Sequence, residues 1–420
     1  MRRVVGALVL ALSVVGAPAA AAEPGAALLE ALARVPDTSA ATDQLVSFVD
    51  YRAAEAARPG AAQPSSFSQW QALRDAGDPS YGLWMAVWQG IGSGSGDLLR
   101  GLLRSGATWP GLLGFDFFDV HSELAFGAPP SDGIVLSGDF DPGAIGRAFT
   151  ARRYTGSDVV GHTLWCPAAG CESGRSIDFE ARNPDNPFGG DLGRNEPMAV
   201  SATDLLGSAD IATVQGMLDA ASRSAPSLAE RPAYRAAAEA VEPDVRLIQA
   251  SMVPGYWLEA DVAGLLMGSE SPEATKALLE KLASTFEPIP PYELVVIADG
   301  ATATEQVVSV ALVYDRAVDA AVAADVIPRR LETMESLAQG QPLREMLASR
   351  GVSSVTGRVV TSSLGDKATA VIVLRAPLAS DQPDPDSGRL TASSLVYRML
   401  MEMVYRRDAL WLAPTLPVLG

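Results

Sequence analysis

Two cysteines are the residues whose spacing points most directly to chemistry. Cys166 and Cys171 are the only cysteines among the 420 residues, and they follow a predicted strand. In an oxidising compartment such a close pair indicates a disulfide around a small loop, in which Pro167 and Gly170 supply the turn. The alternative is a metal site with His162, but it lacks a fourth local ligand and a standard zinc spacing. We therefore predict a disulfide and no metal.

The histidines limit the kinds of catalysis open to the chain. His121 and His162 are its only two, so a histidine-dependent triad must use one of them. Surface or hydrogen-bonded structural roles are the commoner use of such residues. The sequence has no Gly-x-Ser-x-Gly, Ser-x-x-Lys or His-Glu-x-x-His motif, so the usual hydrolase signatures are absent. We predict no catalytic residue and no cofactor, and the pattern favours a protein that is not an enzyme.

Carboxylates close in sequence offer a different chemistry. Asp139 with Asp141, and Asp116 with Asp119, could act as acid and base pairs. Both pairs lie where predicted elements end, and there capping and turn roles are commoner. The segment 183–191 gathers carboxamides and carboxylates on a glycine-bearing loop that could bind calcium through oxygen. It lacks the regular ligand alternation of known calcium loops, so we interpret it as turns.

An aromatic stripe is the most suggestive feature. Tyr81, Trp84 and Trp88 are spaced by three and four on a helix predicted to begin near Pro79, in a region that holds four of the seven tryptophans. Core packing is the commoner meaning of such a stripe. The functional alternative is a lining for an apolar or carbohydrate ligand, or an interface for a partner. These three residues are our candidate ligand-binding residues.

The N-terminus predicts export. Arg2 and Arg3 precede the uncharged apolar run 4–16, and small residues follow up to Ala22, in the order of a bacterial signal peptide. The apolar run is shorter than the roughly 20 residues that span a bilayer. An uncleaved anchor is the alternative. We expect cleavage after Ala22 and a periplasmic or secreted protein.

The charge excludes some partners. The chain has 50 acidic and 32 basic residues, a formal net charge of −18, and loss of the signal peptide would make it more negative. Such a charge repels nucleic-acid phosphates and anionic lipid heads. We predict no nucleic-acid partner and no stable membrane insertion. A small apolar ligand or an envelope protein is the expected partner, and the composition leaves the oligomeric state open.

Apolar periodicity places helices before the first strands. In the segment 23–130, apolar residues recur by threes and fours, as at Leu45, Phe48 and Val49. This spacing predicts a helical, aromatic-rich N-terminal cap.

Two later segments share one order of elements, β-α-β-β-α. The first has strands at 134–140, 159–165 and 198–206, with helices at 142–152 and 211–222. The second has strands at 306–314, 353–361 and 367–375, with helices at 317–337 and 391–407. A strand at 293–298, ending at the turn Asp299-Gly300, precedes the second segment. The pattern predicts an α+β protein with two ferredoxin-like βαββα modules and antiparallel or mixed sheets.

These elements divide the chain into five expected parts. They are the signal peptide 1–22, the cap 23–130, the first module 131–228, a connecting α/β segment 229–292 and the second module 293–420.

Three functional classes fit the sequence. Export, paired modules, an aromatic cap and missing catalytic motifs favour a non-catalytic binding or accessory protein of the bacterial envelope. One alternative is a secreted hydrolase that depends on carboxylates from distant positions. The other is an envelope assembly or interaction factor that uses the aromatic face on a protein partner.

Overall fold

The fold is mixed α+β, as predicted, and is described from a computed structural model. The structure describes residues 26–58, 60–83, 98–241, 245–259, 271–283, 286–378 and 394–416. Its strands are β1 (Val46–Asp50), β2 (Val120–Phe126), β3 (Gly133–Gly138), β4 (Tyr154–Val159), β5 (His162–Pro167), β6 (Met198–Val200), β7 (Asp204–Gly207), β8 (Arg246–Pro254), β9 (Leu294–Ala301), β10 (Glu305–Tyr314), β11 (Ser354–Thr361) and β12 (Ala368–Pro377).

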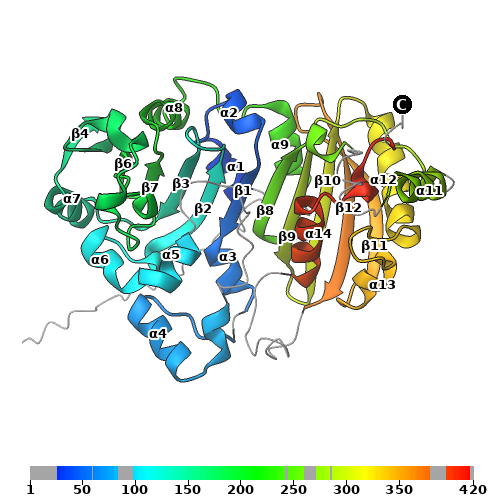
Figure 1. The fold of residues 1–420 in the computed structure, drawn as a ribbon, viewed down its shortest axis with the longest axis horizontal. Helices are drawn as coiled ribbons and strands as arrows, with labels where there is room; N and C mark the ends of the chain where they lie inside the picture. Colours follow the sequence, from blue (N-terminus) through cyan, green and yellow to red (C-terminus); the bar gives the residue numbers. More distant parts are fainter. Residues whose placement is uncertain are drawn as a thin grey trace, which may run out of the picture.

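The helices lie on both faces of these strands (Figure 1). They are α1 (Ala26–Leu32), α2 (Ser39–Thr42), α3 (Tyr51–Ala56), α4 (Phe67–Asp75), α5 (Leu98–Ser105), α6 (Trp109–Leu112), α7 (Pro142–Ala151), α8 (Ile211–Ala221), α9 (Pro232–Glu239), α11 (Pro272–Ala283), α12 (Ala317–Thr333), α13 (Leu343–Ala348) and α14 (Leu395–Tyr405).

The described strands form one 12-stranded sheet in the order β11-β12-β10-β9-β8-β1-β2-β3-β7-β6-β5-β4. Neighbouring strands are antiparallel throughout, and the two halves meet where β1 pairs with β8, with Ser47 opposite Ser251. In the first half, β1, β2 and β3 are consecutive neighbours, α7 follows β3, and the chain returns from edge strand β4 until β7 pairs with β3. In the second half, β8, β9 and β10 are neighbours, α12 follows, and β12 returns from edge strand β11 to pair with β10.

Among the described residues, three hydrophobic cores hold the helices on the sheet. One face carries a core that runs through both halves, where side chains such as Leu32 of α1, Met217 of α8 and Ala237 of α9 are buried. The other face carries one core per half. Trp109 of α6 is buried in the core of the first half, and Leu400 of α14 is buried in that of the second. Because both faces are covered, strands near the centre are apolar on both sides.

That double burial explains where the prediction of a helical cap was wrong. The segment 23–130 contains β1 and β2 besides its helices. Phe48 and Val49, which fit a helical spacing, lie on β1 and point into the cores on opposite faces of the sheet. A short strand that is buried on both faces has adjacent apolar residues, and periodicity does not distinguish it from a helix.

The first predicted module also differs in its strands. The predicted strand 159–165 is a hairpin of β4 and β5 that turns at Val160 and Gly161, both at positive φ. The predicted strand 198–206 is the pair β6 and β7, joined by a turn in which Ser201 Oγ accepts hydrogen bonds from the Thr203 and Asp204 amides. Valine is unusual at positive φ, so the residues of the turn between β4 and β5 do not indicate a hairpin. The ferredoxin-like description of the modules is not confirmed.

Elements with clear local signals lie where they were expected. Asp141 caps α7 by accepting a hydrogen bond from the Gly143 amide, and Pro142 stands in the first turn. The predicted turn Asp299-Gly300, however, lies within β9, and the side chain of Asp299 is fully buried. Its carboxylate accepts hydrogen bonds from Gln249 at 2.9 Å and Gln306 at 2.8 Å, so side chains of the neighbouring strands satisfy this buried group.

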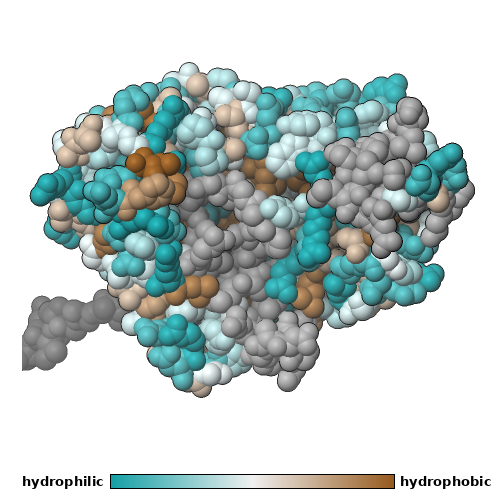
Figure 2. Space-filling model, viewed as in Figure 1, coloured by the Kyte–Doolittle hydropathy of each residue, from teal (hydrophilic) through white to brown (hydrophobic). Residues whose placement is uncertain are grey.

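The structure confirms the Cys166–Cys171 disulfide. It joins the end of β5 to the 3-10 turn Cys171–Arg175, and it packs against the core that both halves share. Hydrophilic side chains dominate the described outer rim in the view of Figure 2. Within the described ranges, no helix combines the length and the apolar character needed to cross a membrane.

Breaking this disulfide is expected to lower the free energy of unfolding by about 2 kcal/mol, because the loop that it closes is short. The double variant Cys166→Ser/Cys171→Ser, compared with the parent protein by urea denaturation, measures this loss. A variant that does not fold, or one as stable as the parent, would contradict the expected contribution.

Candidate functional site

A row of polar side chains crosses four strands beside α1. Asp50 of β1 is opposite Ser122 of β2, Ser122 is opposite Ser137 of β3, and Ser137 is opposite Asp204 of β7. Residues opposite each other in antiparallel strands point to the same face of the sheet. This is the face covered by α1, so the row lies at the end of the core that both halves share.

The row lines a cleft of about 460 Å³ between the strand ends and α1, which we name the strand-end cleft. The lining residues are Ala27, Glu30, Ala31, Arg34, Asp50, Arg52, His121, Ser122, Ser137, Gly138, Asp139, Thr203 and Asp204. Its volume falls within the range of small-molecule sites.

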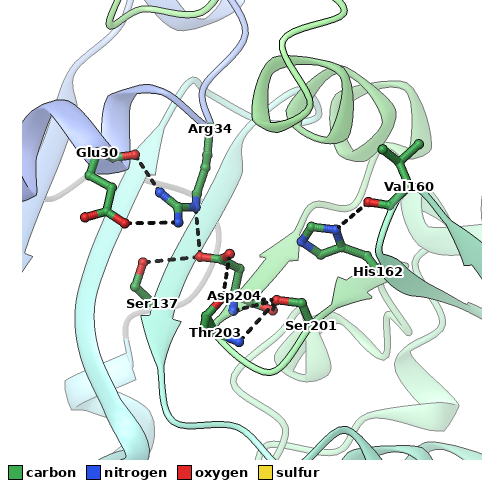
Figure 3. Close-up of polar contacts among 8 residues, drawn as sticks. All are labelled: Glu30, Arg34, Ser137, Val160, His162, Ser201, Thr203 and Asp204. Carbon is green, nitrogen blue, oxygen red and sulfur yellow. Dashed lines mark hydrogen bonds and ion pairs between the residues drawn. The ribbon is translucent and has the colours of Figure 1, made fainter.

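Arg34 and Asp204 form the ion pair at one end of the cleft (Figure 3). The Arg34 Nε atom lies 2.8 Å from Asp204 Oδ1, and the two side chains are only 16% and 11% exposed. Arg34 also donates to the Glu30 carbonyl at 2.7 Å, and Thr203 Oγ1 donates to Asp204 Oδ2 at 3.0 Å. Hydrogen bonds of this kind fix the rotamers of both charged groups and join the turn after α1 to β7.

His121 and Asp139 form a second contact at the other side of the cleft. The Nε2 atom of His121 lies 3.0 Å from Asp139 Oδ2. His121 is at a β-bulge, where the register between β2 and β3 shifts between Val120 and Ser122. Bulges commonly re-aim a side chain next to a functional site. Asp139 is 80% exposed, so a ligand could reach this pair from solvent.

Asp50 is a partly buried carboxylate of the cleft that also caps a helix. Its Oδ1 atom accepts a hydrogen bond from the Ala53 amide at 2.7 Å and so caps α3. Burial raises the pKa of Asp50, although its amide hydrogen bonds and the nearby His121 and Arg246 act in the opposite direction. A partly desolvated carboxylate in a cleft is stabilised by any cation that binds beside it.

Carboxylates outnumber cationic groups in the lining. It holds the acidic side chains of Glu30, Asp50, Asp139 and Asp204 against the guanidinium groups of Arg34 and Arg52. Both guanidinium groups already face carboxylates, since Arg34 pairs with Asp204 and Arg52 lies 3.1 Å from Glu55. The cleft is therefore suited to a polar molecule with a positive group.

The geometry gives less support to nucleophilic catalysis. In the described part of the chain, the ring of His121 makes its hydrogen bond to Asp139 and none to a hydroxyl. A histidine-activated serine would need that second contact. The other histidine, His162, lies across from Ser201 and Asp204 in Figure 3, with Nδ1 3.2 Å from the Val160 carbonyl. Its Nε2 is buried without a hydrogen-bond partner among the described residues.

Tyr81, the described member of the predicted aromatic site, does not line the strand-end cleft. Tyr81 lies in the 3-10 turn Pro79–Gly82, and its carbonyl accepts a hydrogen bond from Trp70 Nε1 at 2.9 Å. The Tyr81 ring packs edge-on against Trp70 at the margin of the first-half core. Trp84 and Trp88 lie outside the described residues, so their predicted role stays a prediction.

The two carboxylate pairs named from the sequence have different roles in the structure. Asp116 and Asp119 form a reciprocal capping box around the 3-10 turn Phe117–Asp119, which is the expected kind of role. Asp141 caps α7, whereas Asp139 contacts His121 in the cleft. The loop 183–191 is built from turns such as that in which the Asn183 amide donates a hydrogen bond to the Gly190 carbonyl.

Sequence reasoning named His121 and Asp139 but missed Arg34, Asp50 and Asp204. Arg34 follows α1, Asp50 ends β1 and Asp204 begins β7, so each resembles an ordinary residue at the end of an element. Only the pairing of distant strands brings them together. The one available signal was that β1, β3 and β7 all carry a polar residue at the same end of the sheet.

Comparison with known proteins identifies no family. No family model and no curated protein matches the chain. Two solved structures of TP0453 are similar at 8% sequence identity: crystal form I has a TM-score of 0.30 and crystal form III one of 0.28. The alignments cover 85% and 82% of this chain and 93% and 92% of theirs. Likeness at this level has no bearing on function.

Proposed function

We propose that the chain is an exported, non-catalytic binding protein of the bacterial envelope, and that its strand-end cleft holds a small polar ligand with a cationic group. The observation that carries the proposal is the row of side chains from Asp50 to Asp204, which closes one wall of a cleft of about 460 Å³. The expected signal peptide supports a place outside the cytoplasm for the mature protein.

Electrostatics favour a cation over an anion. An incoming anion would meet the carboxylates of Asp50 and Asp139, while Arg34 and Arg52 already have acidic neighbours. The net charge of −18 adds a long-range field that attracts cations and repels anions. A primary or quaternary amine fits this field, with the serine hydroxyls of the row to accept or donate further hydrogen bonds.

The two halves of the sheet also support an ancestral repeat. Each half has three consecutive strands, a helix after the third strand, and a return from the sheet edge to that third strand. We propose one duplicated unit, whose copies meet at β1 and β8. The expected ferredoxin-like identity of that unit has no support beyond the order of elements in the second half.

A second candidate is the carboxylate-dependent hydrolase. His121 and Asp139 in contact, together with the raised pKa of Asp50, place possible acid and base groups in one cleft. Such groups are the usual components of acid–base catalysis. Turnover of a cationic substrate that is lost in Asp139→Asn would support this candidate over simple binding.

Calorimetric titration tests the proposed ligand class. We expect putrescine or choline to bind the mature protein, and succinate, a matched anion, not to bind. Asp139→Asn is expected to weaken binding about tenfold, through the loss of one charge-assisted contact. Asp158→Asn, which changes an exposed carboxylate on edge strand β4, is the control and should leave the affinity unchanged. Binding of succinate alone would contradict the proposal.

A further inference from the structure

A buried glutamate lies at the opposite end of β6 from the cleft. Glu196 precedes this strand and is only 3% exposed. Its Oε2 atom is buried and has no hydrogen-bond partner among the described residues. Its backbone carbonyl accepts a hydrogen bond from the Tyr154 hydroxyl at 3.2 Å. A carboxylate in this setting would be desolvated without compensation, so the neutral acid is the favoured form.

Two charged side chains face this acid from different segments. Asp132, 3% exposed, comes from the loop before β3, and its carboxyl disfavours ionisation of Glu196. Arg194, two residues before Glu196, favours ionisation, but no ion pair joins the two side chains in the described structure. The Nε atom of Arg194 is itself buried without a hydrogen-bond partner. Tyr154 also lies near this acid, and a charge on Glu196 raises the pKa of its hydroxyl.

The backbone between these groups is tightly seated. Gly189 is at φ 71°, and a Cβ there would lie 2.5 Å from Glu196 Oε1 and 2.8 Å from Arg194 Cβ. Gly193 is also at positive φ, with the carbonyl of Asp178 pressed against it. The side chains of Glu196 and Arg194 therefore both lie against the Gly189 backbone. If either side chain moves further toward Gly189, the loop 189–195 must shift.

We propose that Glu196 is a pH-responsive latch for the loop 189–195. In its neutral form it stays beside Asp132 and keeps the loop seated on the start of β6. In its ionised form it is repelled by Asp132 and attracted to Arg194, and it can form that ion pair only by displacing the loop.

The direction of the effect follows from the electrostatics. Burial, and then the neighbouring Asp132, raise the pKa of Glu196 to about 8 from an ordinary value of 4.5. The folded loop therefore binds a proton that the opened loop releases between these two values. Its stability is full below pH 4.5 and falls as the pH rises towards 8.

Hydrogen exchange of the intact mature protein tests the latch. Peptides that cover 189–195 are expected to lose protection as the pH rises from 5.5 to 7.5, by up to about tenfold per pH unit after correction for the intrinsic rate. Glu196→Gln, which mimics the neutral acid, is expected to abolish this dependence. Glu180→Gln, at an exposed position of the same region, is the matched control and should behave as the parent protein.

A second variant keeps the test decisive. Arg194→Met removes the group that attracts the ionised acid, so it should retain protection at pH 5.5 and keep this loop seated over a wider pH range. Equal protection of the parent loop at pH 5.5 and 7.5 would overturn the latch. So would an unchanged pH dependence in Glu196→Gln.

Discussion

Replacing Arg330 by methionine is expected to lower the free energy of unfolding by about 3–5 kcal/mol, the usual effect of breaking a buried charged network. Arg330 lies on α12 and is 2% exposed. Its guanidinium donates to the Trp411 carbonyl at 3.0 Å, to the Ala413 carbonyl at 2.8 Å and to the Glu287 carbonyl, and it stacks on Phe286. Its loss leaves these carbonyls without their donor and releases the C-terminal segment from α12.

Arg329→Gln is the matched control for this prediction. Arg329 is the neighbouring residue of the same helix, and its ion pairs with Glu287 and Asp325 are exposed. Such pairs add little because water competes for both charges. Urea denaturation of both variants measures the difference. Equal stability of Arg330→Met and the parent protein would show that Arg330 does not hold the two segments together.

Asp204→Asn is expected to cost about 2–3 kcal/mol of stability, the scale of a partly buried charge-assisted hydrogen bond. It removes the ion pair at 2.8 Å and leaves the largely buried Arg34 guanidinium with the longer contact to Glu30 Oε1, at 3.4 Å, as its remaining ion pair among the described residues. Because Asp204 is one of the carboxylates that line the cleft, the same change should also weaken cation binding there. Thermal unfolding and calorimetric titration of one preparation measure both effects.

A double-mutant cycle with Arg34→Met isolates the pair itself. We expect the two single variants and the double variant to lose similar stability, because the second change removes nothing once the pair is broken. Arg104→Gln is the control: it breaks an exposed pair with Asp191 and should change stability by less than about 1 kcal/mol. Additive losses in the cycle would show that Arg34 and Asp204 act independently.

The sequence predicts elements well where capping chemistry is local. Asp141 and Pro142 mark the start of α7 within one residue, and the second-half order of β10, α12, β11, β12 and α14 agrees with the predicted pattern. The disulfide, which the structure confirms, was predictable for the same reason: Cys166 and Cys171 lie close along the chain. Local spacing is sufficient evidence for features of this kind.

Features that depend on tertiary context were not predictable in this way. The apolar spacing of a strand that is buried on both faces, such as β1, is also compatible with a helix. Asp299 followed by a glycine is typical of a turn, but in the structure it accepts hydrogen bonds from two glutamines on neighbouring strands. The cleft has the same cause. Asp50 and Asp204 come from distant segments and meet only through the pairings of β1, β2, β3 and β7.

The expected boundaries between the cap, the two modules and the connecting segment stay a prediction, although the segment 23–130 is not wholly helical because it contains β1 and β2. The role of Tyr81, Trp84 and Trp88 also stays a prediction. The described strands run in one sheet across those boundaries, with β2 in the expected cap and β3 in the expected first module. Tyr81 itself lies on the face of the sheet opposite to the strand-end cleft, because it packs on the first-half core.

Native mass spectrometry of the mature protein, purified from a bacterial periplasm, tests the proposed function most directly. We predict a reproducible extra mass that is lost on denaturation, identified as a molecule with a cationic group, and strongly reduced in Asp139→Asn but retained in Asp158→Asn. A bare protein that also takes up neither putrescine nor choline would contradict the proposed binding function.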